Sequence, residues 1–313
     1  MEYRALGRSD IAIAPLVLGT NVFGWTIDEK ASFAVLDAFV DAGFNAVDTA
    51  NSYSRWMPGH SGGESETIIG NWVRTSGKRD KLVIATKVGS DMGDGKTVRR
   101  AAILKEAEAS LKRLQVETID LYQTHFDDEV TPVEETLGAY AQLIAQGKVR
   151  AIGASNITPE RLKASLAASE RESLPRYETL QPNYNLYDRA TFERDYAAIC
   201  RDNGIAVIPY YGLAGGFLTG KYRSAADAGK NAARGGKVKD YLNSRGFAIL
   251  RAMDEVVARH RATLAQIALA WLMTKVTAPI ASATSLDQLR DIMAAPRLKL
   301  SADDIAVLDK VSA

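Results

Sequence analysis

The sequence predicts an α/β protein built as a single (β/α)8 barrel, the TIM-barrel fold, and three observations support this. The chain has 313 residues, which is long for an ordinary domain but normal for one such barrel. Eight short apolar runs alternate with helix-like stretches along most of it, a pattern typical of a parallel sheet. No G-x-G-x-x-G motif follows the first run, which disfavours the alternative of an open, doubly wound sheet. We therefore expect residues 1–313 to form one domain.

Residues 2–16 are expected to form a β-hairpin ahead of the barrel. Their polar Gly7-Arg8-Ser9-Asp10 lies between apolar flanks, and such a hairpin could close the bottom of the barrel. The barrel strands are predicted where β-branched and apolar residues form short runs. They are residues 16–19, 45–48, 82–86, 119–123, 149–155, 179–181, 205–209 and 278–280.

The helices are predicted from helical spacing of apolar residues and from end signals. In residues 131–148, Thr131 can cap a helix, Pro132 suits its first position, acidic residues fill the first turn and Gly147 ends it. Residues 158–166 repeat that entry pattern. The predicted helices are residues 29–41, 65–75, 97–113, 132–146, 159–168, 191–203 and 248–259.

Two segments are too long for simple connections. Residues 54–66 form a loop rich in Gly and Ser, and residues 212–245 form a longer, basic excursion after the seventh strand. Loops of this length in a compact domain are usually functional or mobile. In a barrel both follow strands and belong on the C-terminal face, where barrel enzymes carry their chemistry.

Composition excludes several classes of partner. The formal net charge of +1 gives no overall attraction to nucleic acid or anionic membrane. No stretch approaches the roughly 20 apolar residues of a membrane span, and the N-terminus has charges where a signal peptide needs an apolar run. Cys200 is the only cysteine, which excludes an intramolecular disulfide and favours a reducing compartment. It is expected on the apolar side of a helix, which favours a buried thiol over a nucleophile. We expect a cytoplasmic protein without a metal site, since no Cys/His cluster has ligand spacing.

Four residues at the ends of predicted strands suggest one reaction: Asp48, Tyr53, Lys87 and His125. Tyrosine has a pKa of about 10, and a lysine ammonium beside it would favour the phenolate. An aspartate would hold that lysine charged, and a histidine could hydrogen-bond a carbonyl oxygen. Together they predict a proton donor for a carbonyl that is being reduced. Taken singly, the Asp–Lys pair could be a structural ion pair and the histidine a core residue.

The four residues belong to a longer series of motifs in a fixed order, which covers nearly the whole chain. Several such motifs at barrel-like spacing are specific, although no single one is. The motifs are D-T-A-N-S-Y at 48–53, T-K at 86–87, Y-Q-T-H at 122–125, I-G-A-S-N at 152–156, L-Q-P-N-Y-N at 180–185, G-G-F-L-T-G-K-Y at 215–222 and S-A-T-S-L-D-Q-L at 282–289.

With these motifs the chain resembles the aldo-keto reductase superfamily, and in particular bacterial members related to the branch of the potassium-channel β-subunits. The resemblance implies a barrel that binds a nicotinamide dinucleotide across its C-terminal face. It also implies that Tyr53 is the general acid in reduction and the general base in oxidation. Lys87 would lower the pKa of Tyr53, Asp48 would pair with Lys87, and His125 would orient the carbonyl.

The same resemblance implies the cofactor site. Ser155, Asn156 and Gln181 would hold the nicotinamide carboxamide, and Tyr210 would stack on its ring. Read from the residues alone, Tyr210 could be an aromatic at the barrel lip, and Ser155-Asn156 a helix cap. The full expected set is Gly19, Thr20, Asn21, Asp48, Ser155, Asn156, Gln181, Tyr210, Gly212, Leu213, Gly215, Lys221, Arg234, Ser282, Thr284 and Gln288.

Residues 215–221 also fit G-x4-G-K, the start of a phosphate-binding P-loop. Tyr222 stands where the magnesium-binding Ser or Thr is needed, so a pyrophosphate clasp is the better interpretation. Near the adenosine end, neutral Thr284 and Ser285 stand where many NADP-binding relatives carry a basic residue. Cations of the 221–245 loop could compensate, or simply face solvent. We expect NADP(H), with NAD(H) possible. The cations are Lys221, Arg223, Lys230, Arg234, Lys237 and Lys239.

The substrate pocket is expected to be aromatic. Phe23, Trp25, Trp56 and Phe126 fall on loops around the four residues and would suit a carbonyl on a sizeable apolar body, while Arg55 could meet a polar group or solvent. The predicted function is an NAD(P)(H)-dependent oxidoreductase that interconverts an aldehyde or ketone and its alcohol. The alternatives are a cofactor-binding regulatory subunit with little turnover and, less well supported, a Schiff-base lyase or isomerase using Lys87.

Overall fold

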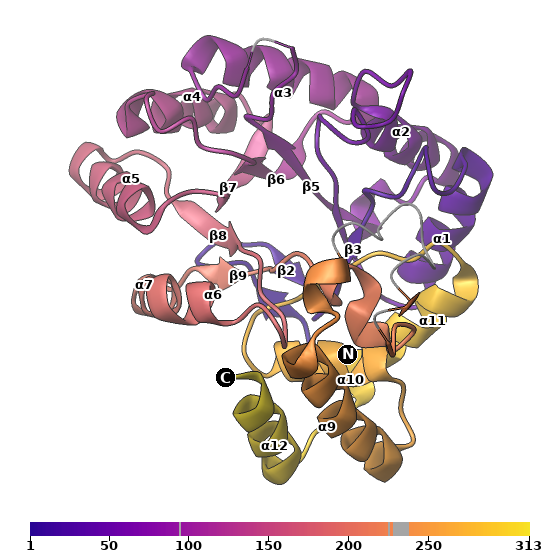
Figure 1. Cartoon of the computed structure of the whole chain (residues 1–313). Helices are drawn as coiled ribbons and strands as arrows, with labels where there is room; N and C mark the ends of the chain where they lie inside the picture. Colours follow the sequence, from indigo (N-terminus) through magenta and orange to yellow (C-terminus); the bar gives the residue numbers. More distant parts are fainter. Residues whose placement is uncertain (94, 225, 228–237) are drawn as a thin grey trace.

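The computed structural model describes residues 1–93, 95–224, 226–227 and 238–313, and eight parallel strands form a ring surrounded by helices (Figure 1). Each strand pairs with its neighbours in sequence, and the last strand, β10, pairs with the first, β3. On the other side of the ring, Ile280 N donates to Pro209 O at 2.9 Å and Thr277 N donates to Val207 O at 3.0 Å. These bonds join β10 to the end of β9. The predicted barrel is confirmed, and the doubly wound alternative is wrong.

Each barrel strand overlaps one of the predicted runs, because short apolar runs bounded by turns are how buried parallel strands read in sequence. β5 and β6 extend to Val88 and Thr124, beyond their predicted ends. The strands are β3 (Val17–Gly19), β4 (Ala46–Asp48), β5 (Val83–Val88), β6 (Ile119–Thr124), β7 (Val149–Ser155), β8 (Tyr177–Gln181), β9 (Ala206–Val207) and β10 (Ile280–Ala281).

The N-terminal hairpin closes one end of the ring, as predicted. β1 (Arg4–Ala5) and β2 (Ala12–Ile13) pair antiparallel. Side chains of the hairpin are buried in one apolar cluster with inward-facing residues from the starts of several barrel strands. The hairpin members are Leu6, Ile11 and Ile13, and the strand members include Val17, Ala46, Ala85, Leu121 and Ala151.

The helices cover the outside of the ring (Figure 1). The predicted helix 191–203 is two helices, because the backbone leaves helical geometry at Tyr196, whose hydroxyl donates to Ile157 O at 2.8 Å. Three further helices, α10 to α12, were not predicted. The bounds are α1 (Glu29–Asp41), α2 (Glu64–Ser76), α3 (Arg100–Leu114), α4 (Val133–Ala145), α5 (Pro159–Glu172), α6 (Ala190–Asp195), α7 (Ala197–Asn203), α9 (Ser244–His260), α10 (Leu264–Met273), α11 (Leu286–Ala294) and α12 (Ala302–Ser312).

The helix ends follow local chemistry with one correction. Thr158 caps α5 as predicted, since its side chain accepts from Arg161 N. Thr131 does not cap α4: its hydroxyl donates to Asp128 Oδ2 at 2.6 Å, and Pro132 takes the cap position. Gly147 follows the end of α4 with φ of 70°, a left-handed conformation that glycine adopts without strain.

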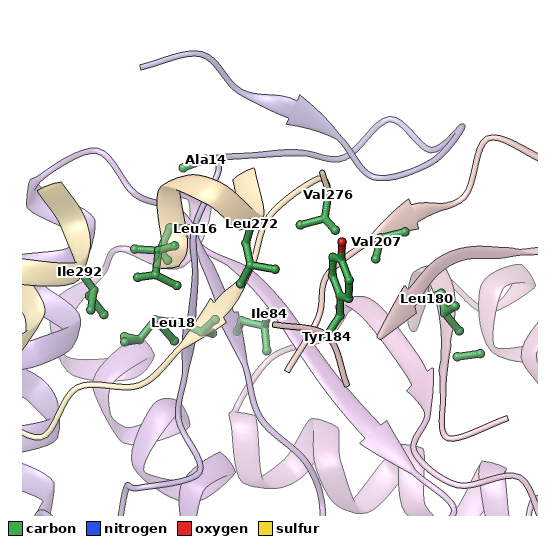
Figure 2. Packing of buried hydrophobic residues seen from close by; sticks show 14 of the residues in the cluster. Ala14, Leu16, Leu18, Ile84, Leu180, Tyr184, Val207, Leu272, Val276 and Ile292 are labelled. Atoms are coloured by element: carbon green, nitrogen blue, oxygen red, sulfur yellow. The ribbon is translucent and has the colours of Figure 1, made fainter. Parts of the chain in front are cut away.

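The main core lies between the strands and the helices. Figure 2 shows side chains from both in one apolar layer, such as Leu18 of β3 and Ile84 of β5 with Leu272 of α10 and Ile292 of α11. Burial of such side chains contributes about 1.5–3 kcal/mol each. This layer fixes the strands from outside, and so fixes the positions at which their C-terminal ends present polar side chains.

Candidate active site

Three strand ends bring the four predicted catalytic residues together. Asp48 is the last residue of β4, Lys87 lies near the end of β5, and His125 directly follows β6. Tyr53 comes from the loop after β4. Lys87 Nζ donates to Asp48 Oδ2 at 2.6 Å and to Tyr53 Oη at 3.2 Å. Parallel neighbours end at the same edge of a sheet, so this juxtaposition follows from the barrel topology.

Lys87 is completely buried and keeps its charge. Its ammonium group has three donors, and the third partner is Thr49 O at 2.7 Å. Burial acts to lower the pKa of Lys87, but the electrostatic attraction and hydrogen bonds of Asp48 and Tyr53 together outweigh it and raise the pKa. The group therefore stays an ammonium ion throughout the neutral range.

Asp48 is held by donors on both carboxylate oxygens. Oδ2 binds Lys87, while Oδ1 accepts from Gln181 Nε2 at 2.8 Å and from Gln123 Nε2 at 3.2 Å. Gln123 was missed by the sequence reading. The signal was a polar residue two positions after Leu121, which faces the barrel interior, because alternation along β6 places both on the same face.

Tyr53 lies at the mouth of the barrel, partly exposed. Burial of its ring is the largest influence on its pKa and raises it, Lys87 lowers it, and Asp48 and Tyr211 raise it. The net result is a raised pKa. The expectation that Lys87 lowers the pKa is right for its own contribution and wrong for the sum. At neutral pH Tyr53 is thus a neutral phenol, the form that can donate a proton.

His125 is held through one ring nitrogen and through its backbone. Its Nδ1 lies 2.8 Å from Ser90 Oγ, its backbone N donates to Val88 O at 2.7 Å, and its carbonyl accepts from Asn156 Nδ2 at 2.8 Å. The ring centroid is 5.8 Å from that of Tyr53. Burial, and then the cations Lys87 and Lys96, place the pKa of His125 well below its usual value, so the ring is neutral.

The residues expected around a nicotinamide ring form one network beside His125. Ser155 Oγ donates to Gln181 O at 2.9 Å, and Asn156 Nδ2 donates to Ser155 Oγ at 3.0 Å. Tyr210 Oη donates to Asn156 Oδ1 at 3.4 Å. The structure therefore brings all four together. Gln181 turns its amide nitrogen to Asp48, so its side chain also belongs to the support of that carboxylate.

A second expected group lies where β3 meets β10. Ser282 Oγ donates to Asn21 Oδ1 at 2.8 Å, and a Cβ added at Gly19 would lie 2.7 Å from Ser282 Oγ, so glycine allows the two strands to approach. Thr20 is fully buried, and its hydroxyl donates to Asp48 O at 2.9 Å. The Thr20 side chain thus supports the backbone that carries Asp48.

A third expected group lies on the loop after β9 and at the start of α11. The short 3-10 helix η2 (Ala214–Thr219) contains Gly215 and Gly216 with φ of 64° and 97°. Lys221 Nζ lies 5.2 Å from the ring of the buried Tyr222, and no helix is present at 221–223, so the P-loop interpretation is unsupported. Gln288 Oε1 accepts from Thr284 N at 2.9 Å.

The remaining residues expected in that group are Gly212, Leu213 and Arg234. Gly212 packs close to α10, since an added Cβ would lie 3.0 Å from Leu272 Cδ1, and Leu213 is partly buried against the core. Arg234 lies outside the described residues, as do Lys230 and Lys237. Arg223 Nη1 forms a salt bridge with Asp254 Oδ2 at 2.7 Å.

Comparison with known proteins shows the family. Residues 15–313 match the model described as the aldo/keto reductase family. The chain belongs to this family. It is 34% identical over 321 residues to the "Uncharacterized oxidoreductase YrpG" of Bacillus subtilis, covering 99% of this chain and 96% of the relative.

Other relatives carry more specific names. The chain is 33% identical to the "Aldo-keto reductase YhdN" of Bacillus subtilis, over 90% of this chain and 84% of the relative. It is 31% identical to the "L-glyceraldehyde 3-phosphate reductase" of Escherichia coli O157:H7, over 99% of this chain and 92% of the relative. The chain is therefore an oxidoreductase of this family.

The aromatic residues expected around the substrate of this aldo/keto reductase divide into two sets. Trp25 and Trp56 meet edge to face at 5.8 Å between ring centroids, and Trp56 lies 5.6 Å from Tyr53. Phe126 stacks on His125 at 4.7 Å. Phe23 is wrong as a pocket residue: it is fully buried in the main core, because its apolar side chain completes the packing there.

Other candidate groups have structural roles or none in this site. Cys200 is buried in α7, and burial raises the pKa of its thiol to about 12, which makes it a poor nucleophile.

Among the residues that the structure describes, no group of three or more His, Cys, Asp and Glu is placed to hold a metal ion. None of the described helices is long and apolar enough to span a membrane.

Proposed function

We propose that this aldo/keto reductase is an NADP(H)-dependent oxidoreductase that interconverts an aldehyde or ketone and its alcohol by direct hydride transfer. The observation that supports this most is the contact of one buried ammonium, Lys87, with both Asp48 at 2.6 Å and the Tyr53 hydroxyl at 3.2 Å. A phenol beside that charge would serve as a proton donor at the barrel mouth. A neutral imidazole, His125, faces the same space.

Each of the four residues has a separate role in the reduction of a carbonyl. His125 donates a hydrogen bond to the carbonyl oxygen and so polarises it. Tyr53 then protonates the oxygen as negative charge develops on it, and Lys87 stabilises the resulting phenolate. Asp48 keeps Lys87 charged and in place. In the opposite direction Tyr53 accepts the proton from the alcohol, which its raised pKa disfavours at neutral pH.

The chain offers groups that fit a nicotinamide dinucleotide. Asn156 and Ser155 present amide and hydroxyl groups suited to a carboxamide, and the partly exposed Tyr210 presents an aromatic face. When bound, the nicotinamide supplies the hydride. A Schiff-base lyase would leave Ser155, Asn156 and Tyr210 without roles, so we rank that alternative last.

The preference for NADP(H) rests on polar groups at the start of α11 and on a cation of the loop after β9. Thr284 and Gln288 are hydrogen-bonded to each other and offer hydroxyl and amide groups to a 2′-phosphate, and Lys221 would add the cation. Fluorescence titration with NADPH and NADH tests this. We expect tighter NADPH binding, and weaker NADPH binding after Lys221→Gln. NADH binding at least as tightly as NADPH would refute the preference.

The substrate is proposed to carry its carbonyl on a sizeable apolar or alicyclic body. Trp56 keeps 50% of its surface exposed beside Trp25 and Tyr53, which leaves an aromatic wall for the substrate. Arg55 is already hydrogen-bonded, since its guanidinium donates to Asp91 O at 2.5 Å. A panel of aldehydes and ketones tests this. A consistent preference for small phosphorylated aldehydes, such as the substrate in the name of one relative, would contradict it.

A regulatory subunit that retains cofactor with little turnover is the second candidate, because the same barrel and cofactor site would serve it. Steady NADPH-dependent turnover of a carbonyl from the panel supports the enzyme. Tight cofactor retention with negligible turnover across the whole panel supports the regulator. The single cysteine supports a reducing, cytoplasmic location for either.

A further inference from the structure

We propose that Ser90 is a positioning residue for the proposed carbonyl reduction: held by Ser52, it fixes His125 as the tautomer that carries its proton on Nε2. His125 then meets the substrate oxygen as a hydrogen-bond donor. The inference rests on the proposed function for its consequence in catalysis. Its structural content, the position of one proton on His125, can be measured without any substrate.

The backbone brings Ser90 to His125 by a close approach of two strand ends. Ser90 follows β5 after Gly89, which has φ of 104°. A Cβ added at Gly89 would lie only 2.6 Å from Phe126 O, so only glycine lets the two segments pass at this distance. His125 N also donates to Val88 O at 2.7 Å. The contact between Ser90 and His125 is therefore built by the barrel.

The imidazole of His125 is neutral, so one of its two nitrogens accepts and the other donates. Ser90 Oγ lies 2.8 Å from Nδ1. Burial and the cations Lys87 and Lys96 disfavour a second proton on the ring. Only the nitrogen that faces away from Ser90, Nε2, is then left for the substrate, and its chemistry depends on where the single proton sits.

The row of hydroxyl groups formed by Ser52 and Ser90 determines which nitrogen of His125 carries that proton. Ser52 Oγ donates to Ser90 Oγ at 3.2 Å, so Ser90 already accepts one hydrogen bond. If Ser90 gives its own proton to Nδ1, each group in the row donates once to the next. With Ser52 as the donor, the reverse arrangement makes Ser90 accept from both Ser52 and Nδ1 and leaves its own proton to solvent. The satisfied arrangement leaves the proton on Nε2.

A carbonyl oxygen is an acceptor only, so a useful His125 must be the donor. With the proton on Nε2 the ring polarises the oxygen, whereas the other tautomer would present a lone pair to it. Ser90 thus acts through His125 and touches no reacting atom. The rate it contributes is that of one hydrogen bond held in the right direction, about threefold to tenfold.

The direct test is the long-range nitrogen–proton NMR spectrum of the three histidine side chains, with His125 assigned through His125→Gln. We expect the His125 signals of an unprotonated Nδ1 and a protonated Nε2. A protonated Nδ1 in the unaltered protein overturns the proposal, whatever the turnover. If the tautomer is as expected but the protein reduces no carbonyl, the proposed function fails and the proton position stands.

The variant test compares Ser90→Ala with Ser90→Thr, which keeps a hydroxyl. We expect kcat/KM for reduction to fall about threefold to tenfold in Ser90→Ala, with the Nδ1 signal shifted and cofactor binding unchanged. Ser90→Thr should restore both. Unaltered rate and unaltered Nδ1 signal in a folded Ser90→Ala would overturn the proposal. If Ser90→Ala does not fold, the spectrum of the unaltered protein decides.

Discussion

Lys87 Nζ and Asp48 Oδ2 lie 2.6 Å apart, and the two side chains are 0% and 4% exposed. Two charges are expensive to remove from water, and their mutual attraction compensates only when the geometry and the remaining hydrogen bonds are good. Here Thr49, Gln123 and Gln181 supply those bonds. The pair therefore depends on both partners being present, for the fold as well as for the chemistry.

Removing one partner of this pair should destabilise the protein strongly. We expect Lys87→Met to lower the free energy of unfolding by about 3–5 kcal/mol, because it leaves the Asp48 carboxylate buried without a counter-charge. The double variant Lys87→Met, Asp48→Asn should recover most of that loss. Urea denaturation measures both. Lys78→Met, which breaks surface ion pairs with Asp37 and Asp41, is the control and should change little; equal losses in Lys87→Met and the control would contradict the account.

The rate of reduction should be nearly independent of pH across the neutral range. Tyr53 must be protonated to donate, and its raised pKa means that this form is lost only as pH rises through a value above about 10. His125 must be neutral, and its lowered pKa means that this form is lost only as pH falls well below about 6.5. We expect kcat/KM for reduction to be flat from about pH 6.5 to 9. A limb with its midpoint inside that range would show that one of the two assignments is wrong.

The outer helices carry a pH-dependent contact of their own. Burial opposes ionisation of Asp304, but hydrogen bonds from His260, Ser301 and Arg259 outweigh it and hold the pKa of Asp304 well below its usual value. Its contribution is therefore present above about pH 4, the pKa of an unfolded aspartate, and is lost as pH falls through the lowered pKa.

Asp304→Asn should accordingly destabilise the protein at pH 7 by about 1.5–3 kcal/mol. The difference from the unaltered protein should shrink as the pH is lowered below about 4. Denaturant unfolding at several pH values measures it. Asp303→Asn, at the exposed neighbouring position, is the control. A destabilisation by Asp304→Asn that does not change with pH would mean that the carboxylate charge is not its cause.

The aromatic wall should decide substrate size. Trp56→Ala removes the ring that lies between Trp25 and Tyr53, so KM for a carbonyl with a large apolar body should rise about threefold to tenfold. Small aliphatic aldehydes do not reach the wall and should be unaffected, which makes them the internal control. Equal effects on large and small substrates would point to a disturbed Tyr53 instead.

The barrel and the meeting of the candidate catalytic residues could be predicted from the sequence because both follow from a simple rule. Apolar runs mark buried strands, and polar residues directly after them meet at one edge of the sheet. Asp48, Lys87 and His125 each end such a run, so their proximity could be predicted. The position of Tyr53 could not be predicted from this rule, because Tyr53 lies in a loop. Only the resemblance to a family assigned it to the candidate site.

What the sequence did not reveal depends on packing between distant segments. α10 is buried along nearly its whole surface, so it lacks the alternation of apolar and polar residues that marks an amphipathic helix. Phe23 and Trp25 are aromatic neighbours on one loop, yet Phe23 enters the core and Trp25 packs on Trp56, which contacts Tyr53. Ser90 and Gln123 act through hydrogen bonds to His125 and Asp48, which only the folded chain brings within reach.

The measurement that tests the central claim most directly is single-turnover oxidation of NADPH by a carbonyl substrate in Tyr53→Phe. Loss of the Tyr53 proton should slow that turnover about 10²–10⁴-fold, with NADPH affinity unchanged because the phenyl ring remains. Tyr211→Phe, which removes a neighbouring exposed hydroxyl, is the matched control and should keep most of the activity. A near-normal rate in Tyr53→Phe would contradict the mechanism.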